Sequence, residues 1–480
     1  MEFPIPQWIL VAFGYLLALV MSLRVVMQRR EPTATLAWVL GMVLLPYIGV
    51  VAYVVFGRRR LVRQVRKRQA QSNLIEPKLE QHLADITNVE HTPLEEMPTR
   101  EQSVLIQLTS RIGCRRQTRG NRVELLVDAD QTYQAMEEAI AEARDHVHFQ
   151  FYVYNDDDTG RRFRDLLTRK AKEGVAVRVL VDGVGSFGLE SFMQPLVAAG
   201  GHFASFLPVG KFRRWHPNLR NHRKLVVVDG RVGFTGGVNI GDEYTGRQKR
   251  TGAWRDTHLR VEGTATAHLQ EIFAEDWHFA TGREPSEQGW FPHVSPCGAA
   301  RVHIVASGPD TDTQPLQRIF FSAVTLAKER VYLTTPYFVP DQAMAVALET
   351  AALRGLDVRL LLPHRSDAPL VLYAGRSYYD ELLQAGVRIF EYQRGFLHAK
   401  TMLVDRQWAT VGSANMDVRS FRLNFEVNAM VYGPHLPDQL ARVFRRDLRL
   451  SREVTLEEVK AKSLTQRAAE SFARILSPVL

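Results

Sequence analysis

Two histidine–lysine pairs are the residues of this sequence best suited to chemistry. The first pair, His222 and Lys224, occurs in "NHRKLVVVDGRVGFTGGVN", in which Asp229-Gly230 predicts a turn. On a β-strand, residues two apart point to the same face, so an imidazole and an ammonium would lie side by side. Gly236, Gly237 and Asn239 follow the next apolar run. A single His-x-Lys pattern would be weak evidence, because most histidines are structural or exposed to solvent.

A second copy of the pattern appears later in the chain, in "LHAKTMLVDRQWATVGSAN". The corresponding residues, in the same order and spacing, are His398, Lys400, Asp405, Gly412, Ser413 and Asn415. A duplicated hairpin with polar turn residues would not explain why both copies keep a histidine and a lysine on one face. The duplication therefore indicates chemistry.

The residue types point to phosphodiester chemistry. A neutral imidazole can attack phosphorus and form a covalent phosphohistidine. Lys224 and Lys400 would then stabilise the negative charge of the transition state, as a metal ion otherwise does, so no metal or cofactor is predicted. Hydrogen bonds would come from two asparagines and from backbone N–H groups near four small residues; loss of one such donor typically costs ~10²–10³ in rate. These predicted phosphate-binding residues are Asn239, Asn415, Gly236, Gly237, Gly412 and Ser413.

Two histidines can divide the work of transfer. One attacks while the other protonates the leaving alkoxide and later deprotonates the incoming hydroxyl. Each imidazole needs its second nitrogen held, and downstream carboxylates that could do so are Asp256 in "AWRDTH" and Glu426 in "LNFEV". Asp229 and Asp405 complete the two motifs, and we count them with the catalytic set. Their position at a turn predicts that they organise the loop and do not touch phosphate.

The sequence around these residues predicts strands and helices that form an α/β repeat. In the first half, "HVHFQFYVY" predicts a strand, "TGRRFRDLLTRKAKEG" a helix and "VAVRVLVD" a strand; "ERVYLTTPYFV", "DQAMAVALETAALRG" and "LDVRLLLP" repeat this order in the second. Gly174 and Gly355 are placed to end the two helices. We predict two halves related by a pseudo-twofold axis, at residues 111–285 and 299–450, joined by a link around 286–298.

A tail at 451–480 should form a C-terminal helix. Its apolar residues Leu464, Ala468, Phe472, Ile475 and Leu476 make roughly one helical stripe. We expect this stripe to pack on the catalytic core, with the membrane surface as the alternative.

The charge distribution indicates a membrane. The net charge is +9, and residues 1–70 contain ten Arg or Lys against two Glu, so the rest of the chain is nearly neutral. A nucleic-acid enzyme usually spreads positive charge over its binding face, whereas here the excess flanks apolar segments. We predict a membrane region at residues 1–60 with hydrophobic segments at about 5–26 and 34–56, followed by a connector at 61–110.

The orientation of this region has two solutions. The basic cluster at 58–68 should stay in the cytoplasm, together with everything after it. Two full spans, which we favour modestly, would place Arg24, Arg29 and Arg30 outside. Alternatively, Pro46 breaks the second segment into a re-entrant or interfacial hairpin, and both basic clusters remain cytoplasmic.

Both motifs resemble the paired His-Lys-Asp signatures of the phospholipase D superfamily. The wider sequence resembles the bacterial cardiolipin synthases of that superfamily, through "ATLAWVLGMVLLPYIGVVAYVVFG", "ASGPD", "TPYFVPD", "RGFLHAKTMLVD", "VGSANMDVRS" and "LSPVL". The resemblance covers essentially the whole chain. It implies an enzyme of the bacterial inner membrane, with its catalytic part on the cytoplasmic side, which joins two phosphatidylglycerols into cardiolipin and releases glycerol. By the same resemblance His222 is the nucleophile and His398 the acid/base, although the sequence alone does not break their near-symmetry.

Other functions compete with this one. A phospholipase D-type hydrolase of membrane lipids would use identical residues, so the motifs do not distinguish it from a synthase. A nuclease of the same superfamily is disfavoured by the membrane segments and by the nearly neutral catalytic part, so no nucleic acid is predicted as a partner. A protein that binds anionic lipid without turnover is disfavoured by two complete motifs. The sequence does not predict the oligomeric state.

Overall fold

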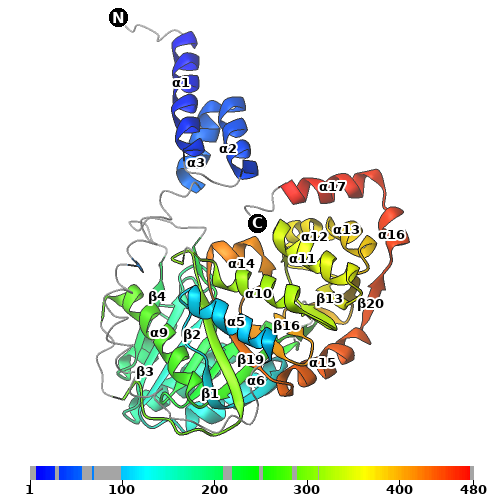
Figure 1. Ribbon diagram of the computed structural model, residues 1–480. Coiled ribbons are helices and arrows are strands. Elements are labelled where there is room, and N and C mark those ends of the chain that lie inside the picture. Colours follow the sequence, from blue (N-terminus) through cyan, green and yellow to red (C-terminus); the bar gives the residue numbers. More distant parts are fainter. Residues whose placement is uncertain are drawn as a thin grey trace, which may run out of the picture. The chain divides into compact units, whose positions relative to one another are not determined.

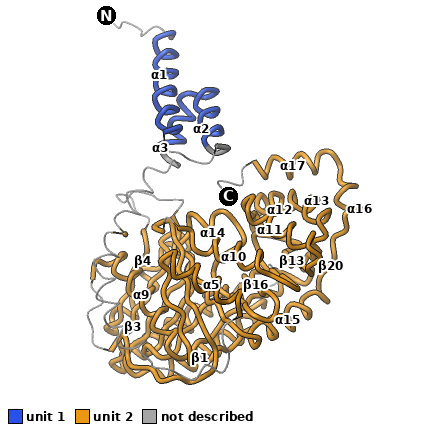
Figure 2. The backbone as a smooth tube through the Cα atoms, viewed as in Figure 1, with its two compact units in different colours: residues 1–67, 216–218 blue, residues 68–215, 219–480 orange. Residues whose placement is uncertain are grey.

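The chain folds into two compact units (Figure 2). The first comprises residues 1–67 with 216–218, and the second comprises 68–215 with 219–480. The computed structural model describes residues 7–27, 32–56, 68–69, 99–208, 219–247, 252–283, 289–311 and 313–475. Arg29, Arg30, most of the basic cluster at 58–68 and most of the predicted connector lie outside the described residues.

The first unit contains three apolar helices: α1 (Gln7–Val26), α2 (Pro32–Leu44) and α3 (Pro46–Phe56). One helix, Trp8–Val26, is long and apolar enough among the described residues to cross a membrane. The second hydrophobic segment is broken where Pro46 begins α3. The 13 residues of α2 extend only about 20 Å, short of a ~30 Å hydrocarbon core. The segment is a helical hairpin, which matches the alternative arrangement rather than the continuous second span that we favoured.

The two helices of the hairpin pack closely at one glycine. A Cβ atom on Gly49 would overlap the backbone of Gly41, so α2 and α3 can approach closely only because position 49 is glycine. Trp38 and Tyr53 make an edge-to-face ring contact across the same pair, with centroids 5.3 Å apart. The hairpin is thus a packed unit, in which Pro46 supplies the turn.

The second unit is built from strands and helices that alternate in each half (Figure 1). A short helix, α5 (Arg100–Arg111), precedes the repeat. The elements of the first half are β1 (Thr118–Val127), α6 (Asp128–Ala141), β2 (His146–Phe151), α7 (Asp158–Lys172), β3 (Ala176–Asp182), α8 (Gln194–Ala198), β4 (His202–Phe206), β5 (Arg220–Asn221), β6 (Leu225–Val228), β7 (Val232–Gly236), η1 (Asp242–Thr245), β8 (Ala253–Arg255), β9 (Thr257–Glu262) and α9 (Ala265–Thr281).

The second half repeats this series before a short tail. Its elements are β10 (Ala300–Ser307), α10 (Pro315–Leu326), β11 (Arg330–Thr334), β12 (Phe338–Val339), α11 (Gln342–Leu353), β13 (Asp357–Pro363), α12 (Pro369–Arg376), α13 (Tyr379–Gln384), β14 (Arg388–Tyr392), β15 (Gly395–Leu397), β16 (Thr401–Val404), β17 (Trp408–Gly412), β18 (Met416–Asp417), α14 (Val418–Arg422), β19 (Asn424–Tyr432) and α15 (His435–Leu448). The tail is β20 (Ser451–Val454), α16 (Leu456–Lys460) and α17 (Leu464–Ile475).

One continuous sheet joins the two halves. From one edge its order is β4-β3-β2-β6-β7-β9-β1, and from the other, after β20, it is β14-β13-β11-β16-β17-β19-β10. The two orders match element by element, and the halves meet where β1 pairs antiparallel with β10. The fold is therefore the mixed α/β repeat expected from the sequence, while the exact limits of the halves stay a prediction.

Local signals explain why the equivalent helices form where the sequence predicts them. The Asp157 side chain accepts a hydrogen bond from Gly160 N at 2.9 Å and caps α7, and Asp341 caps α11 in the same way. Gly174 and Gly355 follow the two helices with φ of +91° and +88°. This left-handed conformation favours glycine, and the predicted helix ends are confirmed.

The tail differs from its predicted packing. Helix α17 rests on the second unit through Glu470 and Ala473, which are buried. The apolar stripe itself faces outward, because Leu464, Phe472 and Ile475 are all exposed. The expectation that this stripe packs on the core is therefore wrong; Leu476 lies outside the described residues.

Candidate active site

The two His-x-Lys segments cross from one half of the repeat to the other. Strand β5, just before His222, pairs in parallel with the start of β19 in the second half. Strand β15, just before His398, pairs in parallel with β8 in the first half. His222 N donates to Phe425 O at 2.9 Å, and His398 N donates to Arg255 O at 2.8 Å. Each motif is thus built partly on the opposite half.

His222–Lys224 and His398–Lys400 are not in regular strands, contrary to the expectation from their spacing. Each tripeptide lies between a short crossing strand and the long strand that follows, β6 or β16. Each lysine Nζ instead donates to the carbonyl of its own histidine, at 2.7 Å in the first motif and 2.5 Å in the second. A local backbone contact therefore fixes each ammonium next to its imidazole.

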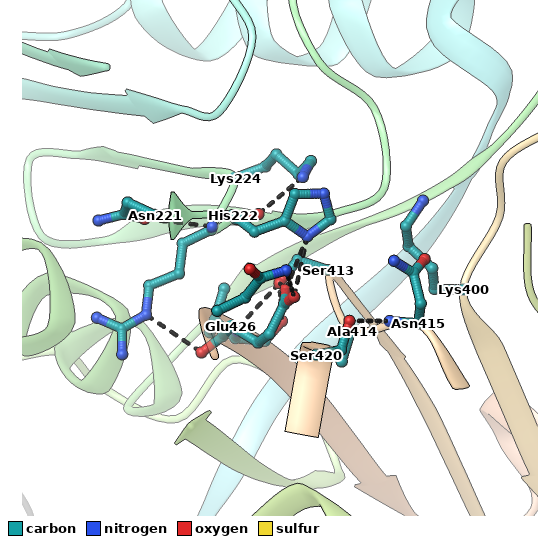
Figure 3. A network of polar contacts seen from close by, with 12 residues as sticks. Asn221, His222, Lys224, Lys400, Ser413, Ala414, Asn415, Ser420 and Glu426 are labelled. Carbon is teal, nitrogen blue, oxygen red and sulfur yellow. Dashed lines mark hydrogen bonds and ion pairs between the residues drawn. The ribbon is translucent and has the colours of Figure 1, made fainter. Parts of the chain in front are cut away.

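Carboxylates hold both histidines, and they too come from the opposite half. Glu426 Oε2 lies 2.9 Å from His222 Nδ1, and Asp256 Oδ2 lies 2.7 Å from His398 Nδ1 (Figure 3 shows the first pair). Both residues were expected to orient a histidine, and the structure places both in that contact. Because Nδ1 is engaged in each ring, Nε2 is the nitrogen left for chemistry.

Two of the small residues that were expected to bind phosphate instead contact these carboxylates. The Ser413 hydroxyl donates to Glu426 Oε2 at 2.5 Å. Its counterpart is Gly237, where a Cβ atom would overlap the carboxylate of Asp256. The backbone N–H groups of Gly237 and Ser413 both donate to carbonyls of neighbouring strands, at 2.9 Å. They are therefore not available to phosphate.

We expect Gly237→Ser to damage the site although serine occupies the equivalent position in the second half. The new side chain would displace Asp256 from His398, and a misplacement of about 1 Å can cost roughly 10²-fold in rate. Turnover of lipid substrate by the purified variant measures this loss. Ser413→Gly is the matched control: it removes the hydrogen bonds of the hydroxyl with Glu426 and Val427 without overlap, so its loss of rate should be smaller. Equal activity of Gly237→Ser and the unchanged protein would contradict this account.

The remaining small residues, Gly236 and Gly412, end the two hairpin strands. A Cβ atom on Gly236 would overlap His258, and one on Gly412 would overlap the side chain of Asn428. The Gly412 N–H group faces Lys400 O at 3.4 Å. These glycines allow the strands to pack closely behind the lysines, and the structure gives Gly412 no free amide for phosphate.

The two asparagines differ. Asn239 Oδ1 accepts from Val153 N at 3.2 Å and its Nδ2 donates to the Tyr244 hydroxyl at 3.3 Å, so this amide is engaged in the fold. Asn415 makes no side-chain hydrogen bond that would hold its amide among the described residues: its buried Oδ1 has no partner, and its Nδ2 is the group that could donate to a phosphate oxygen (Figure 3 labels this residue). Asn415 thus remains a candidate for contact with substrate, whereas the prediction for Asn239 is not supported by its contacts.

Asp229 and Asp405 lie at the far ends of β6 and β16, away from the histidines. The carboxylate of Asp229 accepts from the backbone N–H groups of residues 144–146, and that of Asp405 from residues 328–330. Both have positive φ, at 51° and 54°. The expectation that they organise a turn agrees with these contacts, and their inclusion in the catalytic set does not.

Burial sets the electrostatics of the site. Lys224 and Lys400 are almost completely buried. Burial lowers the pKa of Lys400 to about 8, and burial together with the charge of Lys400 lowers the pKa of Lys224 well below its usual value. The carboxylates Asp256 and Glu426 are the nearby counter-charges. An anionic phosphodiester between the lysines would relieve their repulsion and favour their charged forms.

Burial also lowers the pKa of His222 and of His398 to about 4 each, against an ordinary value of 6.5. Both rings are therefore neutral near pH 7, the form that a nucleophile requires. Glu426 and Asp256 oppose this shift by favouring the imidazolium that forms during reaction.

These shifts predict that the protein loses stability on mild acidification. Below about pH 6.5 the unfolded chain binds protons at His222 and His398 that the folded chain refuses, so the free energy of unfolding should fall between about pH 6.5 and 4.5. Asp256 and Glu426 have lowered pKa values and contribute only below that window. Thermal midpoints across it should vary less in a His222→Gln/His398→Gln double variant, and an equal slope in both proteins would contradict the prediction.

Three aromatic residues at the site were not predicted. Tyr152 meets His222 edge-on with centroids 5.0 Å apart, and Trp254 lies 5.3 Å from His398. Trp254 also stacks on Phe396, with centroids 4.4 Å apart. A weak signal was present for two of them, because Trp254 and Phe396 each precede a site residue, Asp256 or His398, by two positions. The two aromatic residues face each other because Phe396 of β15 is paired with Trp254 of β8. Among the described residues no group of His, Cys, Asp or Glu side chains is placed to hold a metal ion.

Comparison with known proteins agrees with this geometry. The family model "Cardiolipin synthase, PLD-like domain" matches residues 136–277 and 321–448, and "Phospholipase_D-nuclease N-terminal" matches residues 16–58. A cardiolipin synthase of Alkalihalophilus pseudofirmus is 40% identical over 457 residues, which cover 94% of this chain and 90% of that protein. Cardiolipin synthase 1 of Bacillus anthracis is 39% identical over 474 residues, covering 96% and 91%.

A solved structure shares the fold at low sequence identity. The phosphatidylserine synthase of Haemophilus influenzae Rd KW20 is 14% identical, with a TM-score of 0.58, over 75% of this chain and 95% of that one. This likeness concerns the two-half α/β architecture alone.

Proposed function

Since this chain belongs to the phospholipase D-like cardiolipin synthase family, we propose that it transfers a phosphatidyl group from one phosphatidylglycerol to another, giving cardiolipin and glycerol. The observation that carries the proposal is the pair of crossed histidine–carboxylate contacts, His222 with Glu426 and His398 with Asp256. A double displacement at phosphorus requires one neutral imidazole that attacks and one imidazolium that protonates the leaving oxygen. Here each ring is held at Nδ1 by a carboxylate, and the carboxylate also favours the charged form of its ring.

In the first step His222 Nε2 attacks the phosphorus of the donor lipid. A P–N bond forms, the P–O bond to the headgroup glycerol breaks, and the departing oxygen takes a proton from Nε2 of His398, which enters this step as the imidazolium that Asp256 and the bound anionic phosphodiester favour. Glu426 stabilises the positive charge that develops on the His222 ring. Lys224 and Lys400 face the charge on the phosphoryl oxygens, and Asn415 supplies a hydrogen bond.

The second step reverses the first with a different alcohol. The headgroup hydroxyl of a second phosphatidylglycerol gives its proton to His398 and attacks phosphorus, and the P–N bond to His222 breaks. One phosphodiester is consumed and a similar one is formed, so the exchange is close to energetically neutral and requires no nucleotide. The assignment of His222 as nucleophile rests on the family resemblance.

The membrane region fits a reaction between two lipids. Helix α1 is long and apolar enough to anchor the chain in a membrane. The relatives of this chain are named as cardiolipin synthases. An anchor keeps the site near the bilayer, where the local concentration of lipid alcohol is high, and this favours transfer over attack by water. We place the catalytic unit on the cytoplasmic side of the bacterial inner membrane, because arginine-rich segments flank the apolar helices.

A phospholipase D-type hydrolase is the second candidate, since it would use the same histidines with water as acceptor. The aromatic pair Trp254 and Phe396 beside His398 favours the transferase, because it presents apolar surface where water would otherwise be activated.

One assay separates the two functions. Purified full-length protein in vesicles of phosphatidylglycerol, with EDTA and without nucleotide, should release glycerol and cardiolipin in equal amounts. Added glycerol should drive the reaction backward and deplete cardiolipin. Phosphatidic acid as the sole product, in vesicles and in detergent alike, would replace the synthase by the hydrolase.

A further inference from the structure

Arg68, the first residue of the second unit, is buried in an acidic cluster of that unit. Only 2% of its surface is exposed. Its guanidinium makes ion pairs with Asp276 at 2.6 Å and Asp310 at 3.0 Å. It also lies over the ring of Phe425, 4.2 Å from the centroid. A third carboxylate, Glu275, lies 3.9 Å away, and the rings of Phe206 and Phe279 lie 5.7 and 5.8 Å from the guanidinium. A residue twelve positions after the last apolar helix is therefore fixed inside the catalytic unit by acidic side chains and aromatic rings.

The carboxylate of Asp276 connects Arg68 to the first catalytic motif. It accepts from Arg223 at 2.8 and 2.9 Å and from Asn221 Nδ2 at 2.9 Å. These two residues flank His222. Arg223 Nε in turn donates to the backbone carbonyl of Glu426 at 3.1 Å, next to the side chain that holds His222. Asp276 thus lies directly behind the His222 loop.

The second half has a related contact with different neighbours, because Leu397 and Ala399 flank His398 where Asn221 and Arg223 flank His222. There Asp447 of α15 pairs with Arg255 at 2.7 Å, and the Arg255 carbonyl accepts from His398 N. In the first half Phe425 is the counterpart of Arg255, because its carbonyl accepts from His222 N and because Glu426 follows it as Asp256 follows Arg255. Phenylalanine cannot pair with a carboxylate. Arg68 lies on the Phe425 ring and brings a guanidinium to Asp276 in its place.

Asp276 therefore needs both of its arginines. Burial alone would raise the pKa of this carboxyl, but Arg223 and Arg68 lower it to about 2. If Arg68 were removed, Arg223 would be the nearest described positive charge to the carboxylates of Asp276 and Asp310. Arg223 would be drawn toward them and away from the Glu426 carbonyl, and the loop that carries His222 would move with it.

We propose that Arg68 is a positioning residue for the transfer reaction: it replaces the arginine missing from the internal repeat and, through Asp276, holds the His222 loop in place. This inference rests on the proposed function, because it assumes that His222 reacts with phosphorus.

The test uses full-length protein in phosphatidylglycerol vesicles. Arg68→Ala should lower kcat by about 10- to 100-fold and change KM by less than about twofold, since the loop is misplaced while lipid binding is retained. Arg68→Lys keeps the charge without the forked geometry and should fall between. In Arg68→Ala/Phe425→Arg the guanidinium returns at the position that the repeat predicts, so kcat should recover at least tenfold over Arg68→Ala.

Arg115→Ala is the matched control. Arg115 pairs with Glu271 at 2.7 Å and with Glu275 in the same acidic region, but makes no described contact with Asp276, Asn221 or Arg223. Its loss should lower the thermal midpoint and leave kcat at a permissive temperature unchanged. Unchanged kcat in both Arg68→Ala and Arg68→Lys, or no recovery in a folded double variant, would overturn the inference. Failure of the unsubstituted protein to make cardiolipin would instead overturn the proposed function.

Discussion

Replacing His222 by alanine should lower cardiolipin formation by roughly 10⁴- to 10⁶-fold, the scale seen when a covalent nucleophile is removed. The reason is chemical. Without Nε2 there is no P–N bond, and direct attack of one lipid on another would have to occur in a site built for two successive displacements. The rate of labelled cardiolipin formation in vesicles measures the effect, and no covalent lipid adduct should form.

His303→Ala is a suitable control for this substitution. His303 is buried in β10, and burial lowers its pKa to about 4, as it does for His222. Its removal should affect stability and leave the rate within a few-fold. His398→Ala should also be slow, but the adduct should accumulate in it, because breakdown lacks its base. A His222→Ala protein that keeps a tenth of the normal rate would exclude covalent catalysis by this residue.

Neutralising the crossed carboxylates should be nearly as damaging. Glu426→Gln and Asp256→Asn should each lower the rate by about 10³- to 10⁴-fold, because an amide can hold the ring in the wrong tautomer and cannot stabilise an imidazolium. The two variants should also differ in a way that only the crossing predicts. Glu426→Gln should resemble His222→Ala and form no adduct, whereas Asp256→Asn should resemble His398→Ala and accumulate it.

This pairing of phenotypes separates the crossed arrangement from its alternative. If each carboxylate served the histidine of its own half, Asp256→Asn would abolish the adduct and Glu426→Gln would accumulate it. Quenched reactions analysed by intact-protein mass spectrometry distinguish the two patterns. Thermal midpoints of both variants control for the buried hydrogen bonds that the substitutions remove.

Much of this site could be predicted from sequence because its determinants are local. The two motifs have fixed internal spacing, and the helices that support them are marked by Asp157 and Gly174 or by Asp341 and Gly355 at their ends. Asp256 and Glu426 were identifiable as carboxylates downstream of each motif, in "AWRDTH" and "LNFEV". Their contact with the histidines follows from chemistry, since a buried imidazole needs a partner for Nδ1.

The crossing could not be predicted, because very short parallel strand pairs create it. Residues 220–221 pair with 424–425, and residues 395–397 with 253–255. Segments of two or three residues have no periodicity, so nothing local says which half they join. The same limit hid the role of Ser413, whose hydroxyl acts on a carboxylate thirteen positions away in sequence.

The N-terminal region shows a different failure. Pro46 indicated a break in the second hydrophobic segment. We nevertheless expected a second span, because the segment as a whole is hydrophobic. In α17 an apolar stripe was assumed to be the packed face, whereas Ala473 and Glu470 make the contact. A hydrophobic pattern identifies the apolar face of a helix, but the tertiary structure determines which surface packs against that face.

The most direct test of the account is to find where the phosphatidyl group rests between the two displacements. Full-length His398→Ala protein is mixed with labelled phosphatidylglycerol in EDTA, quenched, digested under conditions that preserve phosphohistidine, and mapped by mass spectrometry. We expect a phosphatidyl adduct on His222, and no adduct in His222→Ala. In the unsubstituted protein, a chase with unlabelled lipid should move the label from His222 to cardiolipin. Label on His398 in the unsubstituted protein, or cardiolipin formed with inversion at phosphorus and no adduct, would contradict it.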